Sequence, residues 1–211
     1  MPLIHKTIQT QGIGESNLSD LIASWENDLP AYLKLAYLPA AGMVRLRLTG
    51  KGVKDLEQEM NVRIDKLKEL IAPYLFGYDD DTIQLVVGKL LTEKKKTLAV
   101  AESCTGGFLS HLITSIPGSS TYFMGGTVCY SNASKMSQLQ VSAQTLKEYG
   151  AVSEAVAVEM AIGARKAYNT DFALSTTGIA GPDGGSAEKP IGLVWIGVAT
   201  ENTCFAKKFL L

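Results

Sequence analysis

The feature that most constrains the fold is an alternation of strand-like and helix-like segments after residue 96. Short apolar runs are bounded by glycine, and between them apolar residues recur at helical spacing. The predicted strands cover residues 97–100, 122–130, 171–176, 191–199 and 204–211, and the predicted helices cover residues 108–116, 143–149 and 153–168. Such alternation predicts a layered α/β domain in which helices cover a mixed sheet.

The first part of the chain has a different pattern and predicts a separate small domain. Apolar residues at helical spacing follow Ser16, which is suited to capping a short helix. Over residues 33–49 apolar and polar residues alternate, with a break at 40–42, which predicts a hairpin with one solvated face. Over residues 53–71 apolar residues recur every three or four positions, which predicts an amphipathic helix of about five turns. We predict a small α+β domain over residues 1–78 and, starting with a helix at 82–91, an α/β domain over residues 79–211.

Charge and cysteine usage exclude several classes of partner. The chain has 211 residues, with 20 basic and 21 acidic side chains, so no global charge attracts nucleic acid or anionic lipid. Apolar runs fall short of the roughly 20 residues that span a bilayer, and the N-terminus lacks a signal-peptide pattern. Three cysteines without a CxxC pair favour a reducing cytoplasm, and no cluster has zinc-ligand spacing. We expect a cytoplasmic protein without a membrane, nucleic-acid, metal or cofactor partner.

The segment at residues 99–107 passes from a strand through two glycines directly into a helix. Glycine permits positive φ, and the unpaired N–H groups of a first helical turn stabilise an anion or a developing oxyanion. Ser103 stands where its hydroxyl could act as a nucleophile, although Ser103 or Thr105 could instead only cap the helix. Cys104 is a second candidate nucleophile if it ionises beside the helix N-terminus, and otherwise a small buried residue.

A serine nucleophile needs a base, and neither histidine suits that role. His111 lies eight residues beyond Ser103 in the same strand-turn-helix unit, about 10 Å or more away. Lys135, just after the strand that ends at residue 130, is the remaining candidate. It qualifies only if burial or positive surroundings depress its pKa from about 10.4. The alternative is an ordinary surface lysine.

A third segment, residues 175–186, follows another predicted strand and is rich in glycine. Ligands of open α/β sheets bind at the carboxyl ends of strands, so this backbone is suited to wrap a polar ligand. The alternative is a long turn without function. The segment is neither a P-loop nor a GxGxxG motif.

These three segments closely resemble motifs of one family. AESCTGG at 101–107, YSNASK at 130–135 and TGIAGPDGG at 177–185, followed by KPIG at 189–192, resemble the C-terminal domain of the competence/damage-inducible protein A family, CinA. The resemblance covers about residues 82–211, and residues 1–75 look like the KH-like domain that precedes it in long members. It implies hydrolysis of nicotinamide mononucleotide to nicotinate mononucleotide and ammonia, a serine-lysine arrangement and a homodimer.

The resemblance also implies roles for individual residues. Ser103 would attack the carboxamide while neutral Lys135 takes its proton and Tyr130 positions or relays. The N–H groups of Cys104 to Gly106 would hold the oxyanion. Lys189 and Arg165 are candidate phosphate ligands. The substrate-binding residues implied are Cys104, Thr105, Gly106, Gly107, Asn132, Thr177, Gly178, Ala180, Gly181 and Lys189.

The sequence departs from the family pattern at both ends. Long members begin with a molybdopterin-binding-like domain associated with ADP-ribose pyrophosphatase activity, which nothing here matches, so we expect a fragment and do not assign that reaction. Members usually continue past the last strand into a helix with a glycine- and arginine-containing start. The KH-like part has no evident GxxG clamp, which favours an architectural or dimer-forming role over RNA binding. Two other functions stay open: a non-catalytic pyridine-nucleotide sensor, and an amidase using Cys104.

Overall fold

The computed structural model describes residues 3–211 and divides the chain into two compact units, Met1–Val86 and Val87–Leu211. Each unit has its own sheet and its own buried core. The α/β class predicted from the sequence is confirmed. Within the described residues, no helix combines the length and apolarity needed to cross a bilayer.

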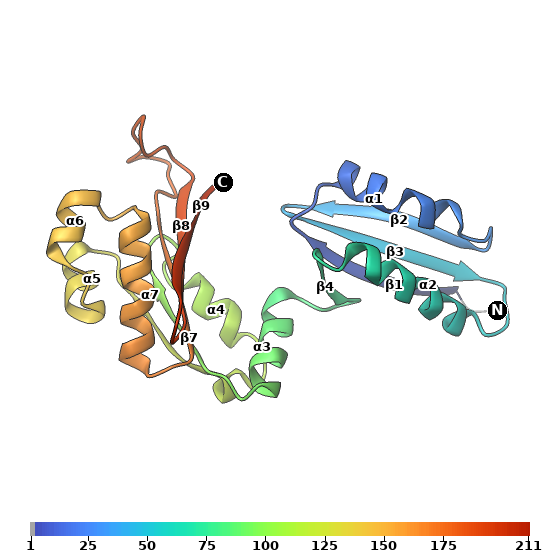
Figure 1. Ribbon diagram of the computed structural model, residues 1–211, viewed down its shortest axis with the longest axis horizontal. Coiled ribbons are helices and arrows are strands. Elements are labelled where there is room, and N and C mark those ends of the chain that lie inside the picture. Colours follow the sequence, from blue (N-terminus) through green and yellow to red (C-terminus); the bar gives the residue numbers. More distant parts are fainter. Residues whose placement is uncertain (1–2) are drawn as a thin grey trace. The chain divides into compact units, whose positions relative to one another are not determined.

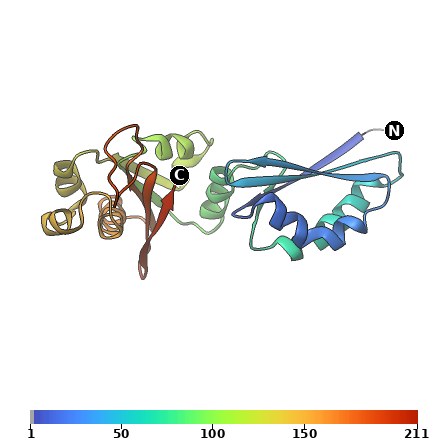
Figure 2. The ribbon, with the colours of Figure 1, turned by 90° about the horizontal axis from the view of Figure 1, so that it is seen from above.

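The first unit is a four-stranded antiparallel sheet with two helices on one face (Figures 1 and 2). The strand order is β2-β3-β1-β4. Leu46 and Leu48 of the central strand β3 pack with apolar residues of both helices, because alternate strand residues share one face. The elements are β1 (Leu3–Gln11), α1 (Glu15–Asn27), β2 (Leu33–Ala40), β3 (Met43–Lys51), α2 (Leu56–Ile71) and β4 (Leu75–Tyr78).

The predicted hairpin and both helices of this unit are confirmed, but three details were wrong. Strands β1 and β4 were not predicted, since β1 mixes polar and apolar residues and β4 has only four. Helix α1 begins at Glu15 with Gly14 as its N-cap, so Ser16 does not cap it. Helix α2 begins at Leu56 rather than 53, because Asp55 before it is in the left-handed conformation.

The second unit is a five-stranded mixed sheet of order β6-β5-β7-β8-β9. Strand β5 runs parallel to β6 and β7, and β7, β8 and β9 are antiparallel in turn. A short 3-10 turn, Ser119–Thr121, precedes β6. Helix α3 (Ile83–Glu93) crosses the division between the units, and the later elements are β5 (Leu98–Glu102), α4 (Phe108–Thr114), β6 (Phe123–Val128), α5 (Asn132–Leu139), α6 (Ala143–Tyr149), α7 (Glu154–Tyr168), β7 (Phe172–Gly178), β8 (Leu193–Ala199) and β9 (Cys204–Leu210).

Helices cover both faces of this sheet, as predicted. Ala99 and Ala101 of β5 belong to the core cluster under α5, α6 and α7, whereas Leu98 and Val100 belong to the opposite cluster with α3 and α4 (Figure 1). Every residue of β5 is buried, as expected for a central parallel strand. Helix α5 was not predicted, because its eight residues carry only two strongly apolar side chains.

The topology brings three loops to one edge of the sheet. Strands β6 and β7 both run parallel to β5, so the segments after all three strands emerge at the same end. These segments are residues 103–107, 129–131 and 179–192. They contain the three motifs that the sequence analysis selected.

Candidate active site

Ser103 lies at a sharp turn between strand β5 and helix α4. Its N–H donates to the Thr176 carbonyl at 3.0 Å, so the first residue after β5 is still fastened to β7. Gly106 and Gly107 then turn the chain with φ values of 58° and 102°, a region that favours glycine. The side chain of Ser103 is only 8% exposed. The Ser103 hydroxyl therefore lies at the edge of the sheet and is largely shielded from solvent.

Glu102, the last residue of β5, holds this turn in place. Its fully buried carboxylate accepts hydrogen bonds from the N–H groups of Gly107, Leu109 and Ser110 at 3.0, 3.0 and 2.7 Å, and from the Ser110 hydroxyl at 2.6 Å. Burial acts to raise the pKa of Glu102, but hydrogen bonds from Ser110 and Thr105 and from backbone N–H groups outweigh it and lower the pKa. Glu102 is thus an ionised cap for the first turn of α4.

Lys135 reaches Ser103 from the first turn of helix α5. Ser131 and Ser134 form a capping box that starts this helix directly after the β6 segment. The Nζ atom of Lys135 lies 2.9 Å from Ser103 Oγ and 2.7 Å from the Cys129 carbonyl oxygen. The predicted serine and lysine are therefore in hydrogen-bond contact.

The surroundings of Lys135 favour a neutral amine. Its side chain is 1% exposed, and within residues 3–211 no carboxylate lies at ion-pair distance from it. Burial lowers the pKa of Lys135 and outweighs smaller raising effects from Cys129 and Cys104. A neutral Nζ can donate to the Cys129 carbonyl and accept the Ser103 proton.

Close packing of α5 on α7 fixes the position of Lys135. Gly163 of α7 lies so near the end of α5 that an added Cβ would be 2.1 Å from the Leu139 carbonyl oxygen. No residue larger than glycine fits this crossing without moving α5. The small residue at 163 therefore lets the end of α5 lie close against α7.

The loop after β7 forms the third side of the candidate active site. The Thr177 hydroxyl donates to the Ala151 carbonyl at 2.8 Å, which ties the end of β7 to the α6–α7 connection. Gly181 has φ of +86°, and a Cβ there would lie 2.7 Å from Ile191. The backbone of this loop consequently lies close to the site with few side chains in between.

These segments enclose a cavity of about 300 Å³. Eight of the residues predicted for catalysis or binding line it: Ser103, Cys104, Tyr130, Lys135, Thr177, Gly178, Ala180 and Gly181. The cavity is also lined by Ala151, Val152, Ile179, Asp183 and Gly184, which the sequence analysis did not select. Tyr130 is at the mouth, since it is 75% exposed.

The other predicted ligands do not line the cavity. The Thr105 hydroxyl pairs with that of Thr176 at 2.7 Å, and exposed Asn132 is the first residue of α5. The Lys189 amine donates to the Tyr149 carbonyl at 2.6 Å and thereby fastens the β7–β8 loop. Arg165 donates to the Asp171 carbonyl, at the start of β7 and so at the opposite end of that strand. Neither cation lines the cavity, and their role as phosphate ligands stays a prediction.

Two of the glycines are engaged in building the turn instead. The Gly106 N–H donates to the Ser103 carbonyl at 3.1 Å, and the Gly107 N–H donates to Glu102. Among the described residues, no backbone carbonyl accepts from the N–H groups of Cys104 and Thr105, whose recorded partner is the Cys104 sulfur. The expected oxyanion donors are therefore reduced from three to two.

Two charged residues of this site were missed by the sequence analysis. Glu102 could have been found, because a carboxylate just before a helix N-terminus is a recognised capping signal. Asp183 lies within the quoted loop motif, but no spacing rule shows that its side chain meets a cavity. Cys104 borders the cavity, and burial raises the pKa of its thiol, which disfavours the thiolate.

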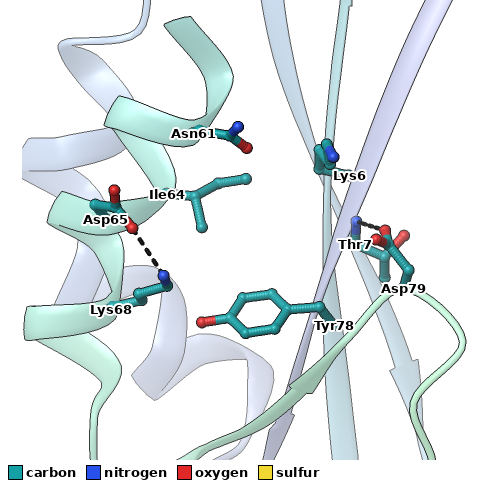
Figure 3. A pocket seen from close by; sticks show the side chains of 8 residues that line it. All are labelled: Lys6, Thr7, Asn61, Ile64, Asp65, Lys68, Tyr78 and Asp79. Atoms are coloured by element: carbon teal, nitrogen blue, oxygen red, sulfur yellow. Dashed lines mark hydrogen bonds and ion pairs between the residues drawn. The ribbon is translucent and has the colours of Figure 1, made fainter. Parts of the chain in front are cut away.

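A cavity of about 370 Å³ in the first unit is a weaker candidate. Figure 3 shows its lysines and carboxylates between α2 and the sheet, with Lys68 directed at Asp65. Lys68 pairs with Asp65 at 2.7 Å and Lys6 with Glu57 at 2.8 Å, while Asp79 accepts from the Thr7 N–H. The hydrogen bonds with Glu57 and Asp65 raise the pKa of Lys6 and of Lys68, so neither amine is suited to act as a base.

No metal site is evident in the described part of the chain, where no three His, Cys, Asp or Glu side chains converge. Cys104, Cys129 and Cys204 are all unpaired thiols. His111 is an exposed residue of α4.

Comparison with known proteins matches both units. One family model, described as "CinA C-terminal domain", matches residues 80–211, and another, described as "Damage-inducible protein CinA KH domain", matches residues 5–77. A CinA-like protein of Cytophaga hutchinsonii is 47% identical over 99% of this chain and 50% of its own length. One from Flavobacterium psychrophilum is 46% identical over 98% of this chain and 50% of its own. The chain thus spans about half the length of these relatives.

Solved structures give the same result. The competence/damage inducible protein CihA from Agrobacterium tumefaciens superposes with a TM-score of 0.59 at 39% identity, covering 60% of this chain and 78% of that one. A CinA superfamily protein from Escherichia coli has a TM-score of 0.59 at 34% identity, covering 63% and 79%. The resemblance drawn from the three motifs is confirmed, together with the KH-like first domain. This chain belongs to the CinA family.

Proposed function

We propose that residues 79–211 form an amidase that hydrolyses the carboxamide of nicotinamide mononucleotide to nicotinate mononucleotide and ammonia. The observation that carries the proposal is the 2.9 Å contact between Ser103 Oγ and the buried amine of Lys135. A cavity of about 300 Å³ is at the small end of the roughly 300–1,000 Å³ typical of ligand sites. This volume suits one aromatic amide ring.

The first half of the proposed reaction forms an acyl-enzyme. Neutral Lys135 takes the proton of Ser103 as Oγ attacks the carboxamide carbon. The carbonyl electrons move to oxygen, and the N–H groups of Cys104 and Thr105 are the candidate donors for the resulting oxyanion. Each such donor contributes about 3–4 kcal/mol in comparable acyl-transfer sites. Lys135 then returns the proton to the amide nitrogen, the C–N bond breaks, and ammonia leaves.

The second half regenerates the enzyme. Lys135 takes a proton from water, the hydroxide attacks the Ser103 ester, and the ester C–O bond breaks as Oγ regains a proton. The products are a carboxylate and free Ser103. The Cys129 carbonyl oxygen lies 2.7 Å from Lys135 Nζ and accepts one of its N–H groups. This contact supports the role of Lys135 as a base, because the lone pair of the neutral amine then points away from the carbonyl and can take a proton.

Several finer points stay predictions from the family resemblance. Tyr130 borders the cavity and is suited to position substrate at its mouth. The homodimer, the cytoplasmic location and the architectural role of the first domain also stay predictions. The amidase that uses Cys104 is less favoured, because burial raises the pKa of its thiol and outweighs the hydrogen bonds from the backbone N–H groups of Cys104 and Thr105.

An ammonia-release assay tests the proposal. The purified chain is given nicotinamide mononucleotide, free nicotinamide and the dinucleotide, and we expect the mononucleotide to be preferred. Ser103→Ala should lower kcat/KM by at least about a thousandfold, as for other nucleophile deletions. Cys104→Ala, the adjacent matched variant, should stay within about tenfold, since it removes only packing.

Three outcomes would contradict the proposal. Full activity in the serine variant would refute the nucleophile, and a preference for free nicotinamide would refute the substrate class. Calorimetric binding of the mononucleotide without ammonia at high enzyme concentration would favour the non-catalytic sensor.

A further inference from the structure

Asp183 is the one acidic residue among the described residues that line the active-site cavity, and the proposed reaction does not use it. It lies in the loop between β7 and β8 and is exposed to solvent. Within residues 3–211, no hydrogen bond or ion pair is recorded for its carboxylate. The group is thus free to meet a ligand.

The loop gives this carboxylate a defined place. Gly181 and Gly184, with φ values of +86° and +90°, flank the residue, and Gly181 packs against Ile191. Lys189, bonded to the Tyr149 carbonyl, anchors the far side of the loop on the end of α6. Gly181 and Lys189 thus fasten the loop on both sides of the carboxylate.

The charge balance of the cavity then favours a cation. Lys135 is the other lining residue that can carry a full charge near neutral pH besides Asp183, and the reaction requires it to be neutral. In the reactive state the lining therefore carries one negative charge and no positive charge. A ring with a fixed positive charge is attracted to such a lining, whereas a neutral ring of the same shape is not.

We infer that Asp183 makes this site select amides carried on a cationic ring, with its carboxylate opposite the charge of an N-alkylated pyridinium. The inference rests on the proposed function, because it names the charge that the same site recognises. A different role would be hydrogen bonding to a ribose hydroxyl. That role would treat the oxidised and the reduced mononucleotide alike, since both carry the same ribose and phosphate.

The test compares nicotinamide mononucleotide with its reduced form, whose dihydropyridine ring is neutral. Dissociation constants for both are measured by calorimetry in the full chain on a Ser103→Ala background, which prevents turnover. Asp183→Asn is compared with Glu188→Gln, an exposed carboxylate of the same loop that does not line the cavity. We expect Asp183→Asn to weaken the cationic ligand by about fivefold, the size of a solvent-screened charge pair, and the neutral one by less than twofold.

The outcomes separate the hypotheses. If Asp183→Asn weakened the binding of both ligands equally, the carboxylate would be assigned to the ribose and the inference would be overturned. Unchanged binding of both ligands would also overturn it. Failure of both ligands to bind would also overturn it. The expected pattern should be absent from Glu188→Gln and should shrink as salt is added. Ammonia release by the unmodified chain is scored separately, so loss of the proposed function does not decide the charge preference.

Discussion

The cavities of the two units both contain lysine, yet they place it in opposite environments. In the first unit, the hydrogen bond with Glu57 raises the pKa of Lys6, and the hydrogen bond with Asp65 raises that of Lys68. In the second unit, burial lowers the pKa of Lys135, which has a hydroxyl and a carbonyl as its partners. The same side chain is thus a fixed cation in one place and a potential base in the other.

This difference teaches how to separate a structural lysine from a catalytic one. Paired and solvated charges at a surface contribute little to folding and impose no chemistry. A buried amine without a carboxylate is costly to fold around, so its retention indicates a use outside stability.

Replacing each lysine with methionine should give the largest contrast. Lys135→Met removes the general base and should reduce kcat/KM by about 10²–10⁴. Because it also removes a buried amine that has no carboxylate partner, the free energy of unfolding should rise by about 1–3 kcal/mol. Lys68→Met is the matched control, with activity within twofold. Ammonia release and urea denaturation check both variants, and a Lys135→Met enzyme with a tenth of normal activity would end the comparison.

The pH profile should reveal the neutral amine. Below the lowered pKa of Lys135 the amine is protonated, so kcat/KM should fall by about tenfold per pH unit as pH decreases. The stability of the fold depends on the same titration and changes with pH in the same direction. Between the lowered folded pKa and the unfolded value, the unfolded chain holds more protons, so the free energy of unfolding rises with pH.

Lys135→Met should lose this contribution to the slope, whereas Lys68→Met should keep it. Denaturation at a series of alkaline pH values measures the difference. Identical slopes in the two variants would show that Lys135 is protonated in both states.

Breaking the Glu102 cap should have an intermediate effect. Glutamine supplies one oxygen where the carboxylate supplies two, and it directs an NH₂ group at backbone donors. Glu102→Gln should therefore lower the free energy of unfolding by about 2–3 kcal/mol and reduce activity by moving Ser103. Glu93→Gln, at the exposed end of α3, should change stability by less than about 0.5 kcal/mol.

The same residue predicts sensitivity to acid. The folded pKa of Glu102 is lowered, so its stabilising contribution is present above the usual carboxyl pKa and is lost as pH falls through the folded value. Glu102→Gln should remove that part of the acid dependence. Acid titrations of stability that coincide for the variant and the unmodified chain would contradict the cap.

The sequence was sufficient to predict the parts of the site that depend on local pattern. Ser103, Lys135 and the loop from Thr177 follow strands, and parallel strands bring their ends together. That reasoning needs only residue type and strand order. It predicted the candidate pair without knowledge of the short helix α5 that presents the lysine.

The positions of the two candidate phosphate ligands depend on contacts between distant segments. Lys189 was considered for phosphate, but its amine binds the carbonyl of Tyr149, 40 residues away. Arg165 was considered as well, but the topology places it at the other end of β7. A long side chain can reach any of several acceptors, and sequence spacing does not choose among them. Glu102 is a different case, because the sequence contains a local signal for its role, a carboxylate just before a helix N-terminus, and that signal was not used.

The smallest predicted effect concerns the ion pair between Lys68 and Asp65 in the first unit. Lys68 and Asp65 are 43% and 67% exposed, so their 2.7 Å ion pair is screened by water. Asp65→Asn should lower the free energy of unfolding by about 0.5 kcal/mol or less and leave ammonia release unchanged. The Lys68 amine also lies 5.3 Å from the Tyr78 ring centre, a contact that the variant retains. If this exposed substitution instead destabilised the chain by several kcal/mol, paired lysines would contribute strongly to folding, and lack of a carboxylate partner would no longer distinguish Lys135 as functional.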